Sequence, residues 1–233
     1  MEAIILAGGL GTRLKSLVDD LPKAMAPIND KPFLEILLKS LASKGFSRVI
    51  LSLGFMAEKI VEHFGKSFDG MELIYEIERE VLGTGGAIRR ALGRAQNEFV
   101  FVFNGDTFLD LEVLKVKTHW LSHLRPIIVA CKVRDTFRYG RLNLADQKVT
   151  SIAEKGVSGP GLINAGCYVL PRQLFKFFTS SPNFSFENDF LKDAIANGEF
   201  DLFITAGHFI DIGIPEDYQR AQRELIHLSG ASK

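Results

Sequence analysis

The sequence has few cysteines, no excess of either charge and no long apolar run. Its only cysteines are Cys131 and Cys167, both in apolar stretches, which excludes a disulfide framework or a cysteine-based zinc site and predicts two buried thiols. Lys plus Arg number 28, as do Asp plus Glu, so the basic excess typical of nucleic-acid or membrane-surface binding is absent. The apolar run Ala3–Ala7 is too short for a signal peptide or a membrane span. We therefore expect a cytoplasmic protein that binds neither nucleic acid nor membrane.

Two common nucleotide-binding motifs are also absent. No segment matches the G-x-x-x-x-G-K-[ST] pattern of a P-loop. A Rossmann fingerprint needs a glycine where Leu14 stands, and an acidic residue at the end of the second strand, where the sequence has Ser52–Leu53–Gly54. Any nucleotide site in this chain must therefore be of another kind.

The apolar pattern of the first half predicts strands that alternate with helices. The predicted strands are Ala3–Leu6, Arg48–Leu53, Leu73–Glu76 and Glu98–Phe103, and the predicted helices are Pro32–Lys44, Glu58–Phe64 and Thr84–Arg94. Such alternation is typical of an α/β fold, in which a mostly parallel, Rossmann-like sheet has helices on both faces.

The pattern loosens beyond Asp106. We expect helices at Leu111–Leu124, Pro171–Thr179, Phe190–Ala196 and Pro215–His227, strands at Pro126–Lys132, Asn164–Leu170 and Phe200–Thr205, a hairpin from Arg141–Leu144 and Lys148–Glu154, and a loop at Lys155–Gly161. The hairpin elaborates the main fold. No linker or internal repeat separates the two halves, so we expect residues 1–233 to form a single domain.

A glycine-rich turn, Gly8–Arg13, follows the first predicted strand. Glycines let backbone N–H groups approach phosphate oxygens closely, and Arg13 can add a charged fork. Lys23 supplies a second cation from a polar loop, as a triphosphate requires. The turn therefore indicates a phosphate-rich ligand; the alternative is a structural turn with cations on the surface.

Two aspartates are candidates for a metal site. Asp106 follows an apolar strand and so lies at the sheet edge where open α/β sheets bind their ligands. A carboxylate there is a good Mg²⁺ ligand; the alternative is a helix N-cap. Asp211 lies between Ile210 and Ile212, and burying an aspartate is costly unless it binds something.

The histidines, in contrast, show no metal-binding spacing. His119 and His123 are four residues apart on a predicted helix, but no third ligand accompanies them in the sequence. We expect them at the surface, and we expect Trp120 to pack in the interior.

Seven motifs follow one another in the order found in a known family. They are LAGGLGTRL (Leu6–Leu14), LPKAMAPI (Leu21–Ile28), LGTGGAI (Leu82–Ile88), NGDT (Asn104–Thr107), AEK (Ala153–Lys155), NAG (Asn164–Gly166) and FIDIGIPEDY (Phe209–Tyr218). With them the chain resembles the sugar-1-phosphate nucleotidyltransferases over nearly its whole length. In that family a sugar 1-phosphate attacks the α-phosphate of a nucleoside triphosphate, and pyrophosphate leaves.

The resemblance implies a role for each motif. Residues 1–110 would bind the nucleotide and residues 111–233 the sugar phosphate. The implied nucleotide-binding residues are Leu6, Ala7, Gly8, Gly9, Gly11, Thr12, Glu78, Glu80, Gly83, Thr84, Asn104 and Gly105. The implied sugar-phosphate residues are Gly140, Glu154, Lys155, Asn164 and Ala165. Arg13, Lys23 and Asp106 would be catalytic, and Asp106 and Asp211 would hold Mg²⁺ as the cofactor. The family more commonly has Trp-x-Asp-x-Gly-Thr where this chain has Phe209 and Ile214, which departs from the motif that carries Asp211.

The base and the sugar depend on finer features. In the family the stretch before Leu82 reads the nucleobase, and an acidic Glu78 or Glu80 would accept both N–H donors of guanine; the alternative is that these glutamates decorate a solvated strand end. DTFRYG (Asp135–Gly140) and SFENDFL (Ser185–Leu191) are most similar to D-glycero-α-D-manno-heptose 1-phosphate guanylyltransferases. GTP and that heptose 1-phosphate are therefore the expected substrates.

Other functions stay open at this point. Within the family, they are a mannose-1-phosphate guanylyltransferase and an N-acetyl sugar-1-phosphate uridylyltransferase. Outside it, they are a glycosyltransferase and a non-catalytic nucleotide-sensing subunit. The resemblance is also compatible with a homo-oligomer.

Overall fold

A computed structural model describes residues 1–9 and 21–226 of the chain. Its first half alternates strands with helices as predicted. The strands are β1 (Glu2–Ala7), β4 (Arg48–Leu53), β6 (Met71–Ile77) and β7 (Phe99–Asn104), and the helices are α1 (Phe33–Ser43), α2 (Ala57–Phe64) and α3 (Gly83–Leu92). Each predicted boundary in this half lies within about two residues of the observed one, which is ordinary fraying of element ends.

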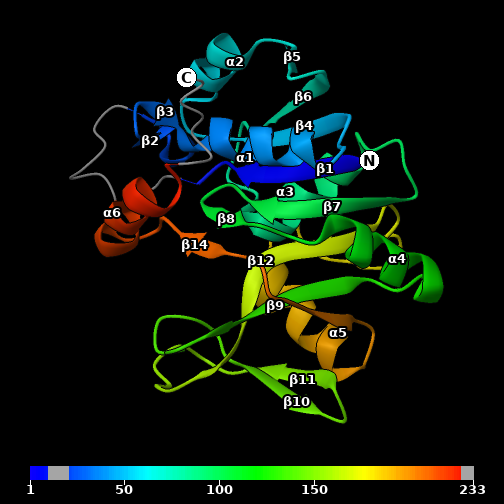
Figure 1. Ribbon diagram of the computed structural model, residues 1–233. Helices are drawn as coiled ribbons and strands as arrows, with labels where there is room; N and C mark the ends of the chain where they lie inside the picture. The colour runs from blue at the N-terminus through cyan, green and yellow to red at the C-terminus, as the bar shows by residue number, and fades with distance from the viewer. Residues whose placement is uncertain (10–20, 227–233) are drawn as a thin grey trace.

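One large sheet runs through the described part of the molecule in the order β13-β9-β12-β7-β1-β4-β6-β5 (Figure 1). β7, β1, β4 and β6 pair in parallel, and β9 (Ile127–Val133) pairs in parallel with β13 (Asp201–Thr205). β12 (Gly161–Pro171) runs antiparallel between β7 and β9, and the short β5 (Ser67–Phe68) is antiparallel to β6. The mostly parallel sheet predicted from the sequence is confirmed, with β12 as an antiparallel insertion.

Helices cover both faces of this sheet because successive strand residues point to opposite sides. Ala3 and Ile5 face the core formed with α1, α2 and α4 (Val113–His123). Ile4 faces the second core, formed with α3 and α5 (Lys192–Ala196). Trp120 is buried in the first core, as expected.

The second half contributes a hairpin that lies apart from the main sheet (Figure 1). Its strands are β10 (Leu142–Ala145) and β11 (Lys148–Ile152). Asp146 and Gln147 between them have φ values of 48° and 62°, as a two-residue type I′ turn requires. The hairpin predicted from the sequence is therefore confirmed.

Several short strands were not predicted. β8 (Thr107–Leu109) pairs antiparallel with β14 (Phe209–Asp211), and β2 (Pro27–Ile28) pairs with β3 (Lys31–Pro32). The pairing of β8 with β14 joins the two segments that carry Asp106 and Asp211. α6 (Pro215–Glu224) follows β14 directly.

The helix predicted at Pro171–Thr179 is wrong. Leu174, Lys176 and Phe178 each donate a backbone hydrogen bond to the residue three positions earlier, so the segment is a run of turns. The phenylalanines at 175 and 178 pack against Phe190, with ring centroids 5.0 Å away in each case. The backbone of this segment therefore follows the packing of these aromatic side chains, and the helical spacing of its apolar residues does not produce a helix.

The helix predicted at Phe190–Ala196 is only partly right. A six-residue π-helix, Phe186–Leu191, precedes the five-residue α5. The Ser185 side chain accepts a hydrogen bond from the Asn188 backbone N–H, 3.2 Å away, and caps its start. π-helical turns of this kind are frequent at functional sites.

Two predictions from composition concern burial and membranes. Cys131 and Cys167 are free and buried, and burial raises the pKa of Cys131 to about 12, so neither thiol is reactive at neutral pH. Among the described residues, no helix combines the length and the apolar character that crossing a membrane requires.

Candidate active site

A pocket opens where the order of the parallel strands reverses. From β1 the chain moves outward through β4 and β6, and then returns to place β7 on the other side of β1. Open α/β sheets bind ligands beyond the carboxyl ends of the strands at such a point. The pocket there has a volume of about 300 Å³. It is lined by residues that end β1 and β7 and by the start of α3.

The structure brings most of the predicted nucleotide-binding residues into this pocket. Those that line it are Leu6, Ala7, Gly8, Gly9, Glu78, Gly83, Thr84, Asn104 and Gly105, together with Lys23 and Asp106. Glu80 is exposed and does not line it. Gly11, Thr12 and Arg13 lie outside the described residues.

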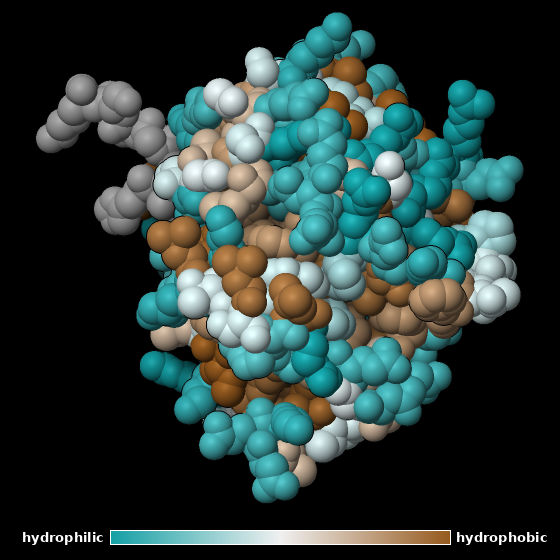
Figure 2. Space-filling model, turned by 90° about the vertical axis from the view of Figure 1, so that its right-hand side faces the viewer, coloured by the Kyte–Doolittle hydropathy of each residue, from teal (hydrophilic) through white to brown (hydrophobic). Residues whose placement is uncertain are grey.

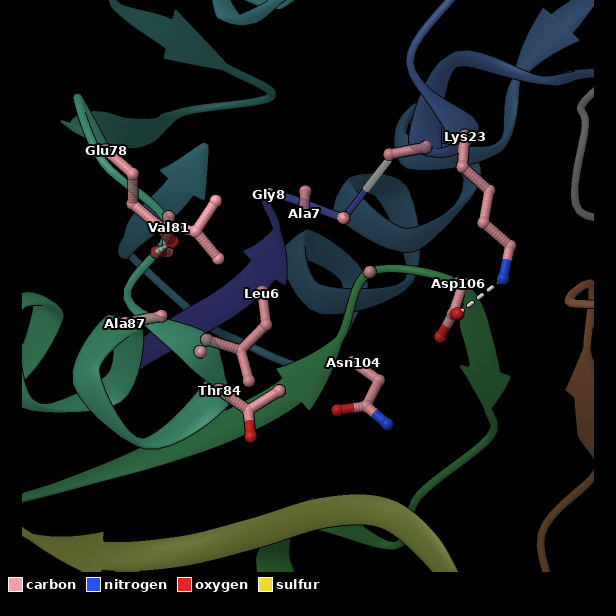
Figure 3. Close-up of a pocket in the computed structure, with 15 residues that line it drawn as sticks. Leu6, Ala7, Gly8, Lys23, Glu78, Val81, Thr84, Ala87, Asn104 and Asp106 are labelled. Atoms are coloured by element: carbon pink, nitrogen blue, oxygen red, sulfur yellow. Dashed lines mark hydrogen bonds and ion pairs between the residues drawn. The ribbon is translucent and has the colours of Figure 1, made fainter. Parts of the chain in front are cut away.

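The charged groups of the pocket lie at opposite ends. Figure 3 shows Glu78 beside Val81 at one end and the Lys23–Asp106 pair at the other, with Leu6, Gly8 and Asn104 between them. An acceptor-only carboxylate thus faces one part of a bound molecule, and a cation faces another. This arrangement suits an elongated ligand with hydrogen-bond donors at one end and negative charge at the other.

Glu78 is held by weak hydrogen bonds in a partly buried position. The Ser52 hydroxyl donates to Oε1 across 3.3 Å, and the Leu82 backbone N–H donates to Oε2 across 3.4 Å. Burial raises the pKa of Glu78 and outweighs the opposing effect of these hydrogen bonds. A Cβ on Gly8 would lie 3.1 Å from Oε1, so glycine there leaves the carboxylate room.

Three glutamates alternate along the sequence at positions 76, 78 and 80, and each has a different environment. Glu76 is buried and forms ion pairs with Arg90 and Arg94, the latter through Nε–Oε2 at 2.8 Å. Glu76 therefore connects β6 to Arg90 of α3 and to Arg94, which lies just after α3. Glu78 faces the pocket, and Glu80 is exposed.

Gly83 has a structural reason to be glycine. Its φ is +67°, and an added Cβ would lie 2.5 Å from the carbonyl oxygen of Phe184. Both the backbone conformation and the packing of the 182–191 segment thus exclude a side chain. These constraints explain the glycine without the nucleotide-binding role that the resemblance implies for Gly83, although Gly83 does line the pocket.

Lys23, Asp106 and Asp211 converge at the other end of the site. The Lys23 Nζ lies 2.5 Å from Asp106 Oδ2. The β8–β14 pairing sets Asp211 opposite Thr107, and the Ile212 N–H donates to the Asp106 carbonyl across 2.9 Å. Burial raises the pKa of Asp211, and the negative charge of Asp106 raises it further.

This donor set fits a hard divalent cation. Two carboxylates repel each other and gain from a positive charge between them, and Mg²⁺ prefers such oxygen ligands. A Cβ on Gly213 would meet both Asp211 Oδ1, at 2.7 Å, and the Lys23 Nζ, at 3.2 Å. The Lys23 ammonium therefore lies near both carboxylates and supplies part of that charge.

The predicted sugar-phosphate residues lie on other segments. Gly140 lies two residues after Arg138. Arg138 forms an ion pair with buried Asp217 of α6 and donates a hydrogen bond to the Tyr139 hydroxyl across 2.7 Å. Glu154 and Lys155 are exposed in the loop after β11. The two loops are linked, because the Gly156 N–H donates to the Phe137 carbonyl across 2.8 Å.

Asn164 lies in a bulge of β12 that adjoins the pocket. The register shifts between Asn164 and Cys167, and Gly166, with φ +65°, donates its N–H to Asn164 Oδ1 across 3.1 Å. A Cβ on Gly166 would lie 2.5 Å from Asn104 Nδ2, and Asn104 lines the pocket. Ala165 in the same bulge is buried.

Sequence reasoning missed Glu187. Its Oε1 accepts hydrogen bonds from Asn164 Nδ2 at 3.0 Å and from the Tyr168 hydroxyl at 3.3 Å. The pKa of Tyr168 is raised well above its usual value, first by burial and then by the charge of Glu187. Glu187 lies on the π-helix, 23 residues from Asn164, so no local pattern joined the two.

Four residues that line the pocket were also missed. They are Ala24, Ser52, Val81 and Ala87. Ala24 and Ala87 lie within quoted motifs and could have been included on that ground. Ser52 is the last residue but one of the second predicted strand, which is a signal for a position near the carboxyl edge of the sheet.

Comparisons with known proteins identify the family of this chain. The nucleotidyl transferase family model matches residues 2–227. The chain is 43% identical to D-glycero-α-D-manno-heptose 1-phosphate guanylyltransferase of Aneurinibacillus thermoaerophilus over 97% of this chain and 99% of the relative. It is 45% identical to the protein of that name from Campylobacter jejuni, over 94% of this chain and 97% of the relative.

A solved structure of a related protein has the same fold. The crystal structure of HddC from Yersinia pseudotuberculosis complexed with GMP-PN superposes with a TM-score of 0.85 at 40% identity, over 96% of this chain and 99% of that one. The family match, the two relatives and this structure each span nearly the whole chain. This chain therefore belongs to the nucleotidyl transferase family.

Proposed function

We propose that the protein is a Mg²⁺-dependent guanylyltransferase that converts GTP and D-glycero-α-D-manno-heptose 1-phosphate into GDP-heptose and pyrophosphate. The observation that carries this proposal is the full-length identity of 43–45% to two proteins with that named activity. The site supports it, because one pocket carries a carboxylate at one end and a cation at the other.

Glu78 is the reader of the base in this proposal. Guanine presents N1–H and N2–H₂ as neighbouring donors, and an ionised carboxylate can accept from both. Adenine presents an acceptor at N1, which a carboxylate repels. Glu78 lines the pocket whereas Glu80 does not, so the geometry favours Glu78 of the two glutamates expected from the sequence.

The transfer itself needs no covalent intermediate. An oxygen of the sugar phosphate attacks the α-phosphorus of GTP and forms a new P–O bond. The bond from the α-phosphorus to the bridging oxygen breaks, and the electron pair leaves with pyrophosphate. The protein contributes positioning and charge neutralisation, with Lys23, and by resemblance Arg13, beside the phosphates.

Asp106 and Asp211 would hold the metal ion. When bound, Mg²⁺ supplies charge stabilisation for the phosphates as they rearrange. The Lys23 ammonium lies 2.5 Å from Asp106, so it forms an ion pair with this carboxylate and orients it.

The sugar would lie between the bulge of β12 and the two linked loops. Asn164 and Glu187 offer a hydrogen-bond donor and an acceptor beside the pocket. Gly140, Glu154 and Lys155 belong to the neighbouring loops, where Lys155 supplies a cation for the sugar phosphate.

A substrate panel tests the proposal. GTP, ATP, UTP and dTTP are each combined with D-glycero-α-D-manno-heptose 1-phosphate, mannose 1-phosphate and N-acetylglucosamine 1-phosphate, and pyrophosphate release is measured. We expect the highest kcat/KM for GTP with the heptose phosphate. A higher value with mannose 1-phosphate would reject the sugar, equal use of UTP would reject the base, and binding without pyrophosphate release would reject the reaction.

A further inference from the structure

A second cluster of ligating side chains lies outside the pocket. His119 and His123 of α4 both approach Asp201, the first residue of β13. His119 Nε2 lies 3.2 Å and His123 Nδ1 3.6 Å from Asp201 Oδ2. The sequence shows no third ligand beside these histidines, and the structure brings the Asp201 carboxylate to them from a strand 82 residues after His119.

The fold determines this cluster at three points. Residues four apart share one face of a helix, so both histidines point the same way. The parallel pairing of β13 with β9 sets Asp201 opposite Ile127, which follows α4 closely in the chain. Arg125 Nε lies 3.1 Å from Asp201 Oδ1, which leaves Oδ2 to the two histidines.

We propose that His119, His123 and Asp201 bind a divalent transition-metal ion, with Zn²⁺ as the best fit. The three ligand atoms lie within 4.8 Å of one another. A tetrahedral Zn²⁺ with bonds of about 2.0–2.1 Å keeps its ligands roughly 3.3 Å apart. The observed separations of 3.2 and 3.6 Å match this spacing.

The ligand set separates this site from the one at Asp106 and Asp211. Imidazole nitrogens suit Zn²⁺, Co²⁺ and Ni²⁺, whereas Mg²⁺ prefers oxygen ligands alone. Across the described residues, these three side chains form the one group of at least three histidine, cysteine or acidic ligands with compatible spacing. The two sites can therefore be loaded and measured separately.

Metal binding requires both histidines to exchange a hydrogen bond for a metal bond. His123 Nδ1 also lies 3.0 Å from the His119 carbonyl oxygen, so without metal its N–H donates to that oxygen. Coordination replaces this hydrogen bond, and the ring proton of His123 moves to Nε2. His119 Nε2 likewise gives up its hydrogen bond to Asp201 Oδ2, while its ring can keep its edge-on contact with Phe203, with ring centroids 6.3 Å apart.

The site is accessible and lies at an edge. The His119, His123 and Asp201 side chains are 28%, 50% and 21% exposed, so water can fill a fourth position. α4 lies on the right of Figure 1, the side that faces the viewer in Figure 2, where hydrophilic side chains surround smaller apolar patches. A metal ion there would tie α4 to β13, the edge strand of the large sheet.

Titration of the full-length protein with Co²⁺ and Zn²⁺ tests the proposal, with saturating Mg²⁺ present to occupy the carboxylate site. The variants are His119→Gln, His123→Gln and Asp201→Asn. His63→Gln is the matched control, because His63 is an exposed helical histidine outside the cluster. Visible absorption reports Co²⁺ coordination, and Tm in EDTA verifies that each variant folds.

We expect one equivalent of Co²⁺ to bind to the wild type and to His63→Gln. Each cluster variant should lose at least ~10-fold in affinity, since even indirect changes at metal sites cost 10–100-fold. Zn²⁺ should raise Tm only in proteins that keep the cluster, because it binds the folded state. Guanylyltransferase activity should stay unchanged in all four variants, which separates this proposal from the proposed function.

Two results would overturn the site. One is saturable Co²⁺ binding by His119→Gln that matches His63→Gln, which would locate the metal elsewhere. The other is a wild type that shows neither a Co²⁺ spectrum nor a Zn²⁺-dependent rise in Tm, in which case the cluster is a pair of His–Asp contacts only.

Discussion

Glu78 and Glu80 are two residues apart in the sequence, yet only Glu78 lines the pocket. We expect Glu78→Gln to narrow the preference for GTP over inosine triphosphate, which lacks the 2-amino donor. A hydrogen bond to a charged group is worth roughly 1.5–3 kcal/mol, so the ratio of kcat/KM values should fall by at least about tenfold. Glu80→Gln is the control and should leave this ratio unchanged.

The same glutamate predicts a pH effect on the wild type. Burial raises the pKa of Glu78, and the protonated carboxyl cannot accept from both guanine donors. KM for GTP should therefore rise as the pH falls through this raised pKa, and Glu78→Gln should lack that rise. Selectivity for GTP that survives Glu78→Gln at every pH would assign base reading to backbone groups.

We expect the Asp211 carboxylate to lower the stability of the metal-free protein and to be required for turnover. Its pKa is raised by burial and by Asp106, so the folded protein disfavours the ionised form. Without metal, stability is therefore lost as the pH rises through this raised pKa, and the neutral side chain of Asp211→Asn avoids the loss. We expect Asp211→Asn to raise Tm in EDTA at neutral pH and to lower kcat at least ~10²-fold with Mg²⁺.

The control for this experiment is Asp110→Asn. Asp110 is 59% exposed on its side chain and pairs with Lys44, so its removal should neither raise Tm nor lower kcat. The Tm values of the wild type and Asp211→Asn should also converge at acidic pH, where both side chains are neutral. If Asp211→Asn instead lowered Tm in EDTA, the result would contradict the view that burial of the Asp211 carboxylate destabilises the metal-free protein.

Glu187 should act on the sugar rather than on the nucleotide. It accepts hydrogen bonds from Asn164 and Tyr168 beside the pocket. Glu187→Ala should raise KM for the sugar 1-phosphate at least about tenfold, because a lost contact leaves a polar partner unpaired, while KM for GTP changes little. Asp193→Asn, at an exposed position of α5, is the control. Equal effects on both KM values would mean that Glu187 only supports the fold.

At the scale of single residues, sequence reasoning works where neighbours are local. Gly8, Lys23 and Asp106 belong to short motifs, and the structure brings them into one pocket. Glu187 and Asp201 were missed because their partners come from other elements, 23 and 82 residues away. Neither spacing nor composition can supply such a pairing before the fold is known.

At the scale of elements, α3 and the 182–191 segment are fitted to each other through glycine. A Cβ on Gly85 would lie 2.1 Å from Phe184 Cε2. Ala favours helices over Gly by ~1 kcal/mol, but overpacking costs about 1–3 kcal/mol. Gly85→Ala should therefore lower Tm, although it improves the helix propensity of α3.

Gly9→Ala provides the contrasting variant. Its Cβ would meet no atom of the other described residues within 4 Å, so we expect no change in Tm. Gly9 lines the pocket, so KM for GTP should rise instead. A Gly85→Ala protein that is more stable than the wild type would show that Phe184 can move, and that the segment is less firmly seated than its packing indicates.

The elements themselves were predictable where apolar runs or helical spacing were strong. β4 and β7 are nearly continuous apolar strands buried on both faces, which is the pattern expected of a parallel sheet. The turns at 171–179 were mistaken for a helix because Phe175 and Phe178 are three apart, a spacing that both turns and helices produce. β8 and β14 are three residues each, too short for any periodicity.

At the scale of the whole molecule, removal of metal should stop turnover without unfolding the protein. The fold rests on two apolar cores that surround the sheet, whereas Asp106 and Asp211 lie at its edge. EDTA should therefore abolish pyrophosphate release while the protein stays folded, and Mg²⁺ should restore activity. Zn²⁺ added in place of Mg²⁺ should not restore it fully. Activity that persists in EDTA would reject the metal dependence.

The topology was predictable only in part. Alternation of strands and helices predicts the parallel strands β1, β4, β6 and β7, and the right-handed crossover rule limits their order. The antiparallel β12 between β7 and β9 follows from no local signal, because its burial on both faces gives the same apolar run as a parallel strand.

The position of β12 also bears on how the chain matures during synthesis. β7 and β9 are made before residues 161–171, yet β12 pairs with both, and the other partner of β9, β13, comes later still. Until β12 emerges, the apolar β9 has no partner in the sheet and β7 has an open edge, which are features that promote aggregation. A ribosome that pauses between β9 and β12 would therefore expose this protein to chaperones at its most vulnerable stage.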